Sequence, residues 1–228
     1  MVTARVQPRP PPSAADARGF SLVELLIVMA ISSLILGSAV MIASGVQRTA
    51  GHQLDDAAVQ QEARYALGWI RQTLASAGSN PYRVTISACP SSGTPFAPIR
   101  LDPNGNGLQD DIRVQSDINP PNGVLLGLSG ACTEEGEDVT IALDLSGGLT
   151  GPLTRLDRAR ETTAVPVTDG IFTQLVFSYL TQSRTATTNP SAVAYIGVSL
   201  TARSRAADPR TGAFTAFTFD SEVRLRSR

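Results

Sequence analysis

A single acidic residue stands inside a long apolar run near the start of the chain. The run extends from Phe20 to about Val46, and Glu24 is the only charged residue in it. On membrane-insertion scales a charged side chain at the centre of a helix costs about 2.5–3.5 kcal/mol, and less near a helix end. A group of opposite charge would offset that cost. We therefore expect the Glu24 carboxylate to have a partner.

The residues around Glu24 form a recognisable processing signal. Residues 18–31 read RGFSLVELLIVMAI, which resembles the class III signal of type IV pilins and type II secretion pseudopilins. The resemblance implies that a prepilin peptidase cleaves after Gly19 and that Phe20, the new N-terminal residue, is N-methylated. It also implies that Glu24 acts in filament assembly, with other major and minor pilins and an inner-membrane assembly platform as partners.

Two other interpretations of the apolar run are a secretory signal peptide and a plain signal anchor. A secretory signal has an apolar core of about 7–15 residues followed by a small-x-small cleavage site. The run at residues 20–46 is longer and can span a bilayer roughly 30 Å thick as a helix. A plain anchor needs neither the Gly19–Phe20 junction nor an acid at this offset, so we favour prepilin processing.

Charge predicts the orientation of this segment in the lipid bilayer. Arg5, Arg9 and Arg18 precede the apolar run, whereas Asp55 and Asp56 follow it. Because basic residues are retained on the cytoplasmic side, we expect a single-pass inner-membrane protein with a cytoplasmic N-terminus and a periplasmic body, which then enters a pilus or pseudopilus. The formal net charge of −1 argues against nucleic-acid binding, since such surfaces are basic.

The composition also argues against an enzyme. The chain contains no lysine, which excludes lysine catalysis and P-loop lysines. Its one histidine, His52, lies among polar residues after the apolar run, and we expect it to be solvated on a helix. No serine stands in a Gly-x-Ser-x-Gly motif, and we expect the acidic residues 134–138 to form a solvated loop face. We predict that the protein is not an enzyme and requires no cofactor.

Cys89 and Cys132 both lie in the part of the chain expected outside the cytoplasm. Two cysteines in an oxidising compartment form a disulfide more often than they remain free. The chain-entropy model gives roughly 3–4 kcal/mol for a loop of this length. The alternative is a pair of unbonded, small hydrophobic residues.

The segment DPNGNGLQDD at residues 102–111 has the composition of a cation-binding loop. Alternating oxygen side chains, a glycine for a tight bend and later acids are typical of calcium loops, and calcium takes about 6–8 oxygen ligands. The pattern departs from the EF-hand at position 12, which is Arg113 instead of Glu. The alternative is an Asn-Gly turn that carries polar side chains and has no bound ion. The candidate ligands are the side chains of Asp102, Asn104, Asn106, Asp110 and Asp111 and the backbone carbonyl of Leu108.

A long helix must position Glu24. After the polar stretch at residues 47–53, apolar residues return at helical spacing, with Leu67, Ile70 and Leu74 on one face. Gly78 fits the C′ position that ends a helix. A helix over residues 20–77 would be about 87 Å long, so its first half must lie in lipid or against other helices.

Short β-like runs follow, separated by Gly, Pro and Asn clusters. The stronger candidates are Thr173–Leu180, Ala194–Ala202 and Phe214–Leu225, and the weaker ones are Arg83–Ala88, Ile112–Gln115 and Asp138–Leu143. We expect an α+β, pilin-like fold in which an antiparallel sheet packs on the second half of the helix, with Tyr65 and Trp69 against the sheet.

The expected organisation has four parts. They are a prepilin leader at residues 1–19, a transmembrane and assembly helix at 20–46, an extracytoplasmic amphipathic helix at 47–78 and a globular β-rich pilin domain at 79–228.

Beyond the signal, scattered segments resemble PilW-type minor pilins. They are QEARYAL at residues 61–67, DIRV at 111–114, GEDVT at 136–140 and DGI at 169–171, which leads into LVFSY at 175–179. J-type minor pseudopilins of type II secretion carry a strand similar to the last. The resemblance implies a minor pilin that helps start or cap a type IV pilus. A minor pseudopilin is the alternative, and a single-span anchored periplasmic binding domain or hydrolase is a third interpretation if the leader is not processed.

Overall fold

The computed structural model describes residues 21–83, 85–87, 94–118, 121, 123, 125 and 134–225. The predicted cleavage site at Gly19 and Phe20 lies outside these residues, as do Cys89 and Cys132. The chain divides into two compact units, residues 1–48 and residues 49–228. Helix α1, Leu22–Ser76, contributes residues to both units.

The first unit contains the apolar half of α1. Its large apolar side chains are exposed from Leu22 to Val46. Among the described residues, α1 is the one helix long and apolar enough to cross a membrane. Ser33, Ser38 and Ser44 each donate their hydroxyl to the carbonyl oxygen three residues earlier, at 2.8 Å. Because these hydroxyls are satisfied within the helix, they do not prevent the segment from lying in hydrocarbon.

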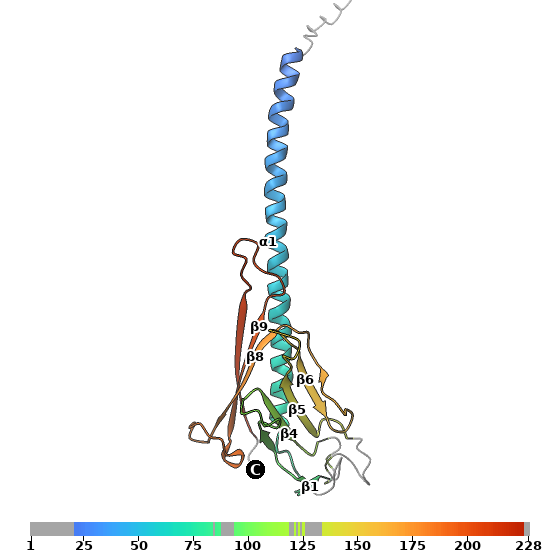
Figure 1. The fold of residues 1–228 in the computed structure, drawn as a ribbon, viewed down its shortest axis with the longest axis vertical. Helices are drawn as coiled ribbons and strands as arrows, with labels where there is room; N and C mark the ends of the chain where they lie inside the picture. The colour runs from blue at the N-terminus through green and yellow to red at the C-terminus, as the bar shows by residue number, and fades with distance from the viewer. Residues whose placement is uncertain are drawn as a thin grey trace, which may run out of the picture. The chain divides into compact units, whose positions relative to one another are not determined.

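Antiparallel sheets make up the β part of the second unit (Figure 1). One sheet has the strand order β3-β4-β5-β6-β7, a second has the order β10-β9-β8, and β1 pairs with β2. The strands are β1 Ile86–Ser87, β2 Thr94–Pro95, β3 Ile99–Leu101, β4 Asp111–Gln115, β5 Asp138–Leu143, β6 Leu153–Asp157, β7 Val165–Pro166, β8 Phe172–Leu180, β9 Tyr195–Arg203 and β10 Ala216–Arg224, with the 3-10 helix η2 at Pro190–Ala192.

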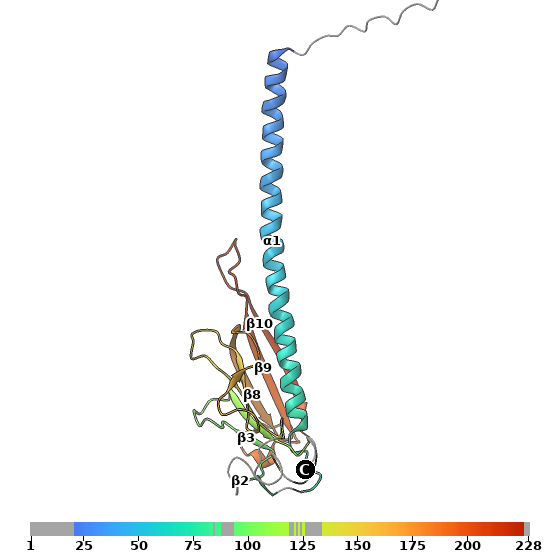
Figure 2. The same ribbon diagram turned by 90° about the vertical axis from the view of Figure 1, so that its right-hand side faces the viewer.

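The second half of α1 packs against these sheets. In both views the strands lie alongside this part of the helix (Figure 1, Figure 2). Its fully buried residues recur every three or four positions, which places them on one helical face. Two of them are alanines. The buried residues of this face are Val59, Ala63, Ala66, Ile70 and Leu74.

The helix ends where the sequence predicted. Gly78 has φ +74°, a left-handed conformation that a residue with a Cβ adopts at a cost of roughly 1–2 kcal/mol. Its N–H donates to the carbonyl of Gln115 at 3.0 Å. The end of α1 is thereby tied to β4.

The predicted α+β fold is confirmed, and the strand predictions differ in accuracy. β5 has the predicted bounds, and β8, β9 and β10 lie within two residues of theirs. The alternation also holds: Leu175, Phe177 and Tyr179 of β8 are all buried. Strands β2, β3, β6 and β7 were not predicted, because two to five residues with mixed polarity carry too little periodicity.

One packing prediction on the helix is half right. Trp69 is partly buried against the core, as predicted. Tyr65 is 67% exposed, so the prediction that it packs on the sheet is wrong. Residues four apart differ by about 40° around an α-helix, so Trp69 lies nearer to the buried face than Tyr65.

Candidate functional site

Glu24 lies in the first turn of α1, and Ser21 immediately precedes the helix. The Glu24 Oε2 accepts the backbone N–H of Ser21 at 3.5 Å, a long hydrogen bond. Ser-x-x-Glu at a helix start is a capping box, in which the acid satisfies the N–H of the cap residue. A carboxylate here also interacts favourably with the helix dipole. Glu24 therefore supports the start of its own helix.

The same arrangement bears on the predicted processing. Phe20 directly precedes Ser21 in the chain, so cleavage would create an ammonium group one residue from the N–H that Glu24 accepts. The carboxylate is exposed and can face an amine of its own or of a neighbouring chain. The cap was not among the features predicted from the sequence, although Ser-x-x-Glu before an apolar run is its signature.

The loop at residues 102–111 connects β3 to β4 as an antiparallel hairpin. Asp102 accepts the N–H of Asn106 at 3.0 Å and that of Gly107 at 2.8 Å. Asn104 Oδ1 accepts the N–H of Asn106 at 2.9 Å. Asn106 Oδ1 accepts the N–H of Leu108 at 2.7 Å. The side-chain oxygens that the sequence grouped as candidate ligands thus turn toward the interior of one loop.

Asp111 closes this loop from the first position of β4. Its Oδ2 accepts the N–H of Asn104 at 3.1 Å. Its Oδ1 is buried, since the residue is only 2% exposed, and this oxygen has no hydrogen-bond partner. Burial raises the pKa of the Asp111 carboxyl to about 6, and the carboxylates of Asp110 and Asp102 raise it further while the Asn104 N–H opposes the shift.

Tyr179 on β8 lies within the electrostatic reach of the same three carboxylates. Its hydroxyl is buried and has no hydrogen-bond partner. Burial raises the pKa of the Tyr179 phenol, and the charges of Asp111, Asp102 and Asp110 raise it further. Two unsatisfied polar atoms therefore belong to one electronegative region, and this could not be read from the sequence.

A second polar cluster ties the helix to two loops of the second unit. Glu62 on α1 accepts the backbone N–H of Asp169 at 2.5 Å and pairs with the Arg205 guanidinium at 3.0 Å. Arg205 also pairs with the Asp169 carboxylate. Two helical turns away, Asp55 accepts the backbone N–H groups of Arg205 and Ala206 at 3.0 and 3.2 Å. This cluster holds the loop before β8 and the loop after β9 against α1.

A third cluster is buried between β4 and β5. The Arg113 guanidinium donates to both oxygens of Asp138, at 2.6 and 2.5 Å. Gln115 donates to Asp138 at 2.8 Å. Glu134, Glu137 and Asp138 are all buried, at 9%, 0% and 0% exposed, so the prediction that the acidic residues 134–138 form a solvated face is wrong for these three. Pairing of β5 with β4 places Asp138 inside the fold.

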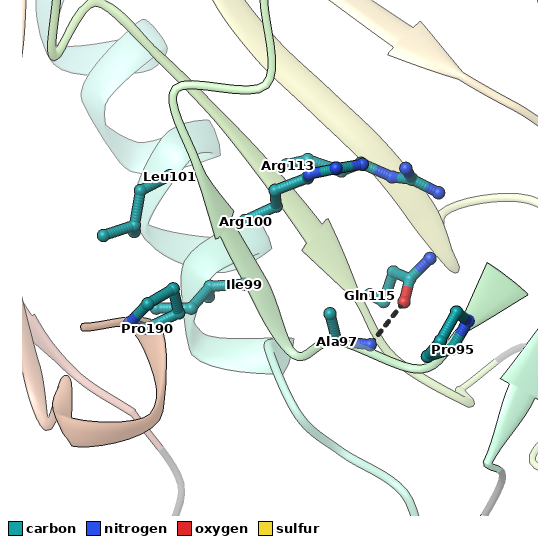
Figure 3. Close-up of a pocket in the computed structure, with 8 residues that line it drawn as sticks. All are labelled: Pro95, Ala97, Ile99, Arg100, Leu101, Arg113, Gln115 and Pro190. Atoms are coloured by element: carbon teal, nitrogen blue, oxygen red, sulfur yellow. Dashed lines mark hydrogen bonds between the residues drawn. The ribbon is translucent and has the colours of Figure 1, made fainter. Parts of the chain in front are cut away.

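A pocket of about 490 Å³ lies beside this buried pair (Figure 3). Its wall is largely apolar, with Ile99 and Leu101 of the edge strand β3 and Pro190 of η2. Gln115 is held there by the N–H of Ala97 at 2.8 Å. The lining residues offer no carboxylate, hydroxyl, thiol or imidazole for catalysis; they are Pro95, Ala97, Ile99, Arg100, Leu101, Arg113, Gln115 and Pro190.

His52, Asp55 and Asp56 form one further group that could hold a metal ion, with ligand atoms within 4.8 Å of one another. The His52 side chain is only 16% exposed, so the prediction of a solvated histidine is wrong. Its Nε2 lies 3.9 Å from Asp56. Asp55 Oδ2 also accepts the backbone N–H groups of Arg205 and Ala206.

Comparison with known proteins identifies one segment. Residues 15–40 match the model of the prokaryotic N-terminal methylation motif. No curated protein and no solved structure matches the chain significantly. The match covers the Gly19–Phe20 junction and Glu24, so the chain carries a class III prepilin signal, and its α+β architecture is consistent with the pilin fold.

Proposed function

We propose that this type IV pilin-like protein is a minor pilin of the PilW type, which helps initiate or cap a pilus after cleavage at Gly19 and N-methylation of Phe20. The observation that carries the proposal is the prepilin signal at residues 15–40. Its residues from Leu22 onward lie on helix α1, whose exposed apolar surface suits lipid or neighbouring helices. The protein acts as a structural subunit in the inner membrane and then in the filament, not as an enzyme.

Assembly depends on the amine released by cleavage. A methylated Phe20 amine remains cationic, and Glu24 is the only acid in the apolar run. When helices of neighbouring subunits stagger, the carboxylate of one chain neutralises the amine of the next. Two opposite charges that would each be costly in hydrocarbon are then buried together, so pairing favours one register of the helices.

The PilW assignment is supported by contacts between the segments that resemble that group. Glu62, in the first segment, accepts the N–H of Asp169, in the last one. Arg113, in the second, pairs with Asp138, in the third. The Arg113–Asp138 pair joins the second and third segments through both side chains, whereas the Glu62 contact uses a backbone N–H, which does not depend on the side chain at position 169.

A minor pseudopilin of type II secretion is the second candidate. The observation that favours it is β8, where Leu175, Phe177 and Tyr179 are buried at alternate positions after Asp169-Gly170. J-type pseudopilins carry a similar strand. The processing signal is common to both systems, so the two candidates differ in what the filament does.

Deletion of the gene, followed by complementation, tests the proposal. Loss of surface pili with normal protein secretion supports the minor pilin. Loss of secretion with normal pili supports the pseudopilin. Normal pili and normal secretion contradict both.

Mass spectrometry of the membrane-extracted protein tests the processing step. We expect the mature chain to begin at a methylated Phe20 and a bulky substitution, Gly19→Val, to leave the leader attached. Gly37→Val is the control, because a side chain there meets no atom within 4 Å, and it should be processed normally. An intact leader in wild-type cells with an active prepilin peptidase would remove the pilin assignment.

A further inference from the structure

We propose that the β3–β4 loop, residues 102–111, binds a calcium ion through Asp102, Asn104, Asn106, Asp110, Asp111 and the carbonyl of Leu108. The proposal does not depend on the choice between pilus and secretion. It rests on two independent features of the structure: a loop lined with inward-turned oxygens, and buried polar atoms that lack a partner at its base.

The loop has the shape that a calcium site requires. The first six residues, from Asp102 to Gly107, place oxygen side chains at the first, third and fifth positions and glycine at the sixth. Gly107 has φ +77°, the left-handed conformation for which glycine is suited. An EF-hand loop uses a glycine at its sixth position for a sharp turn and the carbonyl of its seventh residue as a ligand. Leu108 stands at that seventh position.

The buried atoms supply the independent argument. Asp111 Oδ1 is buried without a hydrogen-bond partner, while Oδ2 of the same carboxylate accepts an N–H of the loop. The Asp111 carboxylate therefore contacts the loop through one oxygen while its other oxygen stays unsatisfied. The buried Tyr179 hydroxyl also lacks a partner. The charged groups that act on Asp111 are the carboxylates of Asp110 and Asp102, which increase the negative charge there. A bound cation would compensate a buried charge that is otherwise costly.

The donor set favours calcium over other cations. All proposed ligands are oxygens, and the set contains none of the sulfur or nitrogen ligands that zinc prefers. Calcium accepts about six to eight oxygens in flexible geometry, whereas magnesium demands a rigid octahedron and retains water. Asp110 is held only by long contacts from the Asn106 amide, at 3.3 and 3.4 Å. Its carboxylate can therefore turn toward an ion.

Calorimetric titration of the full-length protein in detergent, after treatment with chelator, tests the site. We expect one calcium ion to bind with a dissociation constant between about 10⁻⁴ and 10⁻³ M, the range of extracellular calcium modules. Magnesium should bind at least roughly tenfold more weakly. Calcium should also raise the melting temperature. Absence of calcium binding up to 10⁻² M, or equal binding of magnesium, would overturn the proposal.

Asp111→Asn and Asp102→Asn should each weaken calcium binding roughly tenfold or more, since affinity follows ligand charge. Asp144→Asn is the matched control. Asp144 is an exposed acid in the β5–β6 hairpin that accepts the N–H of Ser146 at 2.9 Å, and it has no part in the loop. If it weakens binding as much as the loop variants do, the ion responds to general negative charge and not to this site.

A comparison with and without calcium separates metal binding from folding. Asparagine can still accept the Asn104 N–H but carries no buried charge. In chelator, Asp111→Asn should therefore melt no lower than the wild type, whereas in calcium it should melt lower. A variant that melts lower by the same amount in both conditions would show that Asp111 is structural only, which contradicts the proposal.

Discussion

Replacing Glu24 separates two roles that its position allows. As a helix cap it accepts the Ser21 N–H at 3.5 Å, and a cap of this kind stabilises a helix by about 1 kcal/mol. As the partner of an amine on a neighbouring chain, it gains Coulomb attraction. At about 4 Å and an effective dielectric constant near 20 this attraction is roughly 4 kcal/mol, before the cost of burial is subtracted. The second value corresponds to at most about a thousandfold in association.

Glu24→Gln distinguishes the two roles. Glutamine serves a capping box as well as glutamate does, so the helix start is retained while the charge is lost. We expect Glu24→Gln to reduce filament formation, or protein secretion, to the same extent as Glu24→Ala. It should also reduce the recovery of partner pilins in pull-downs from solubilised membranes to the same extent. Cleavage and the melting of the second unit should stay unchanged, because the described hydrogen bond of Glu24 is local. Glu222→Gln, an exposed acid on β10, is the control and should assemble normally.

Two results would refute this reasoning. If Glu24→Gln assembles like the wild type while Glu24→Ala does not, Glu24 acts as a cap and its charge is irrelevant. If Glu24→Ala remains uncleaved while partner contacts of the surviving protein are normal, Glu24 belongs to the recognition element of the peptidase.

Three further predictions concern stability. Non-reducing mass mapping should show Cys89 linked to Cys132, and reduction should lower the free energy of unfolding by roughly 2–4 kcal/mol; two freely alkylated thiols would contradict the bond. Asp138→Asn should destabilise the protein by about 3–5 kcal/mol in denaturant titration, because it leaves a buried guanidinium unpaired, whereas Glu222→Gln should cost no more than about 1 kcal/mol for an exposed pair; equal effects would contradict the assignment of a buried pair. Gly78→Ala should cost roughly 1–2 kcal/mol because of its positive φ, and an unchanged unfolding midpoint would show that the helix end can relax.

The sequence predicted well the features that act along the chain. The Gly19–Phe20 junction, the apolar run and Glu24 form a linear signal, and a family model matches residues 15–40 of it. The buried face of α1 and the alternation in β8 and β9 were also predictable, since a helix and a strand each have a fixed period. The capping box of Ser21 and Glu24 was predictable in the same way, because its Ser-x-x-Glu pattern is local.

The burial of polar residues was not predictable in the same way. Asp110 and Asp111 are neighbours with the same side chain, yet Asp111 is only 2% exposed and Asp110 is not buried. Asp138 looked like part of a solvated acidic loop. In the folded chain it is paired across the sheet with Gln115 and bonded to the Arg113 guanidinium.

By itself, then, the sequence determined the helix able to cross a membrane, the processing signal and the α+β class, because periodicity and local motifs are properties of consecutive residues. Only the tertiary structure decided which acidic residues form buried ion pairs and which have a buried oxygen without a hydrogen-bond partner. It also decided which of them come together in one loop. Those outcomes depend on strand register and on pairing between β4 and β5. A shift of one residue in that register would exchange the faces on which the side chains of β5 lie.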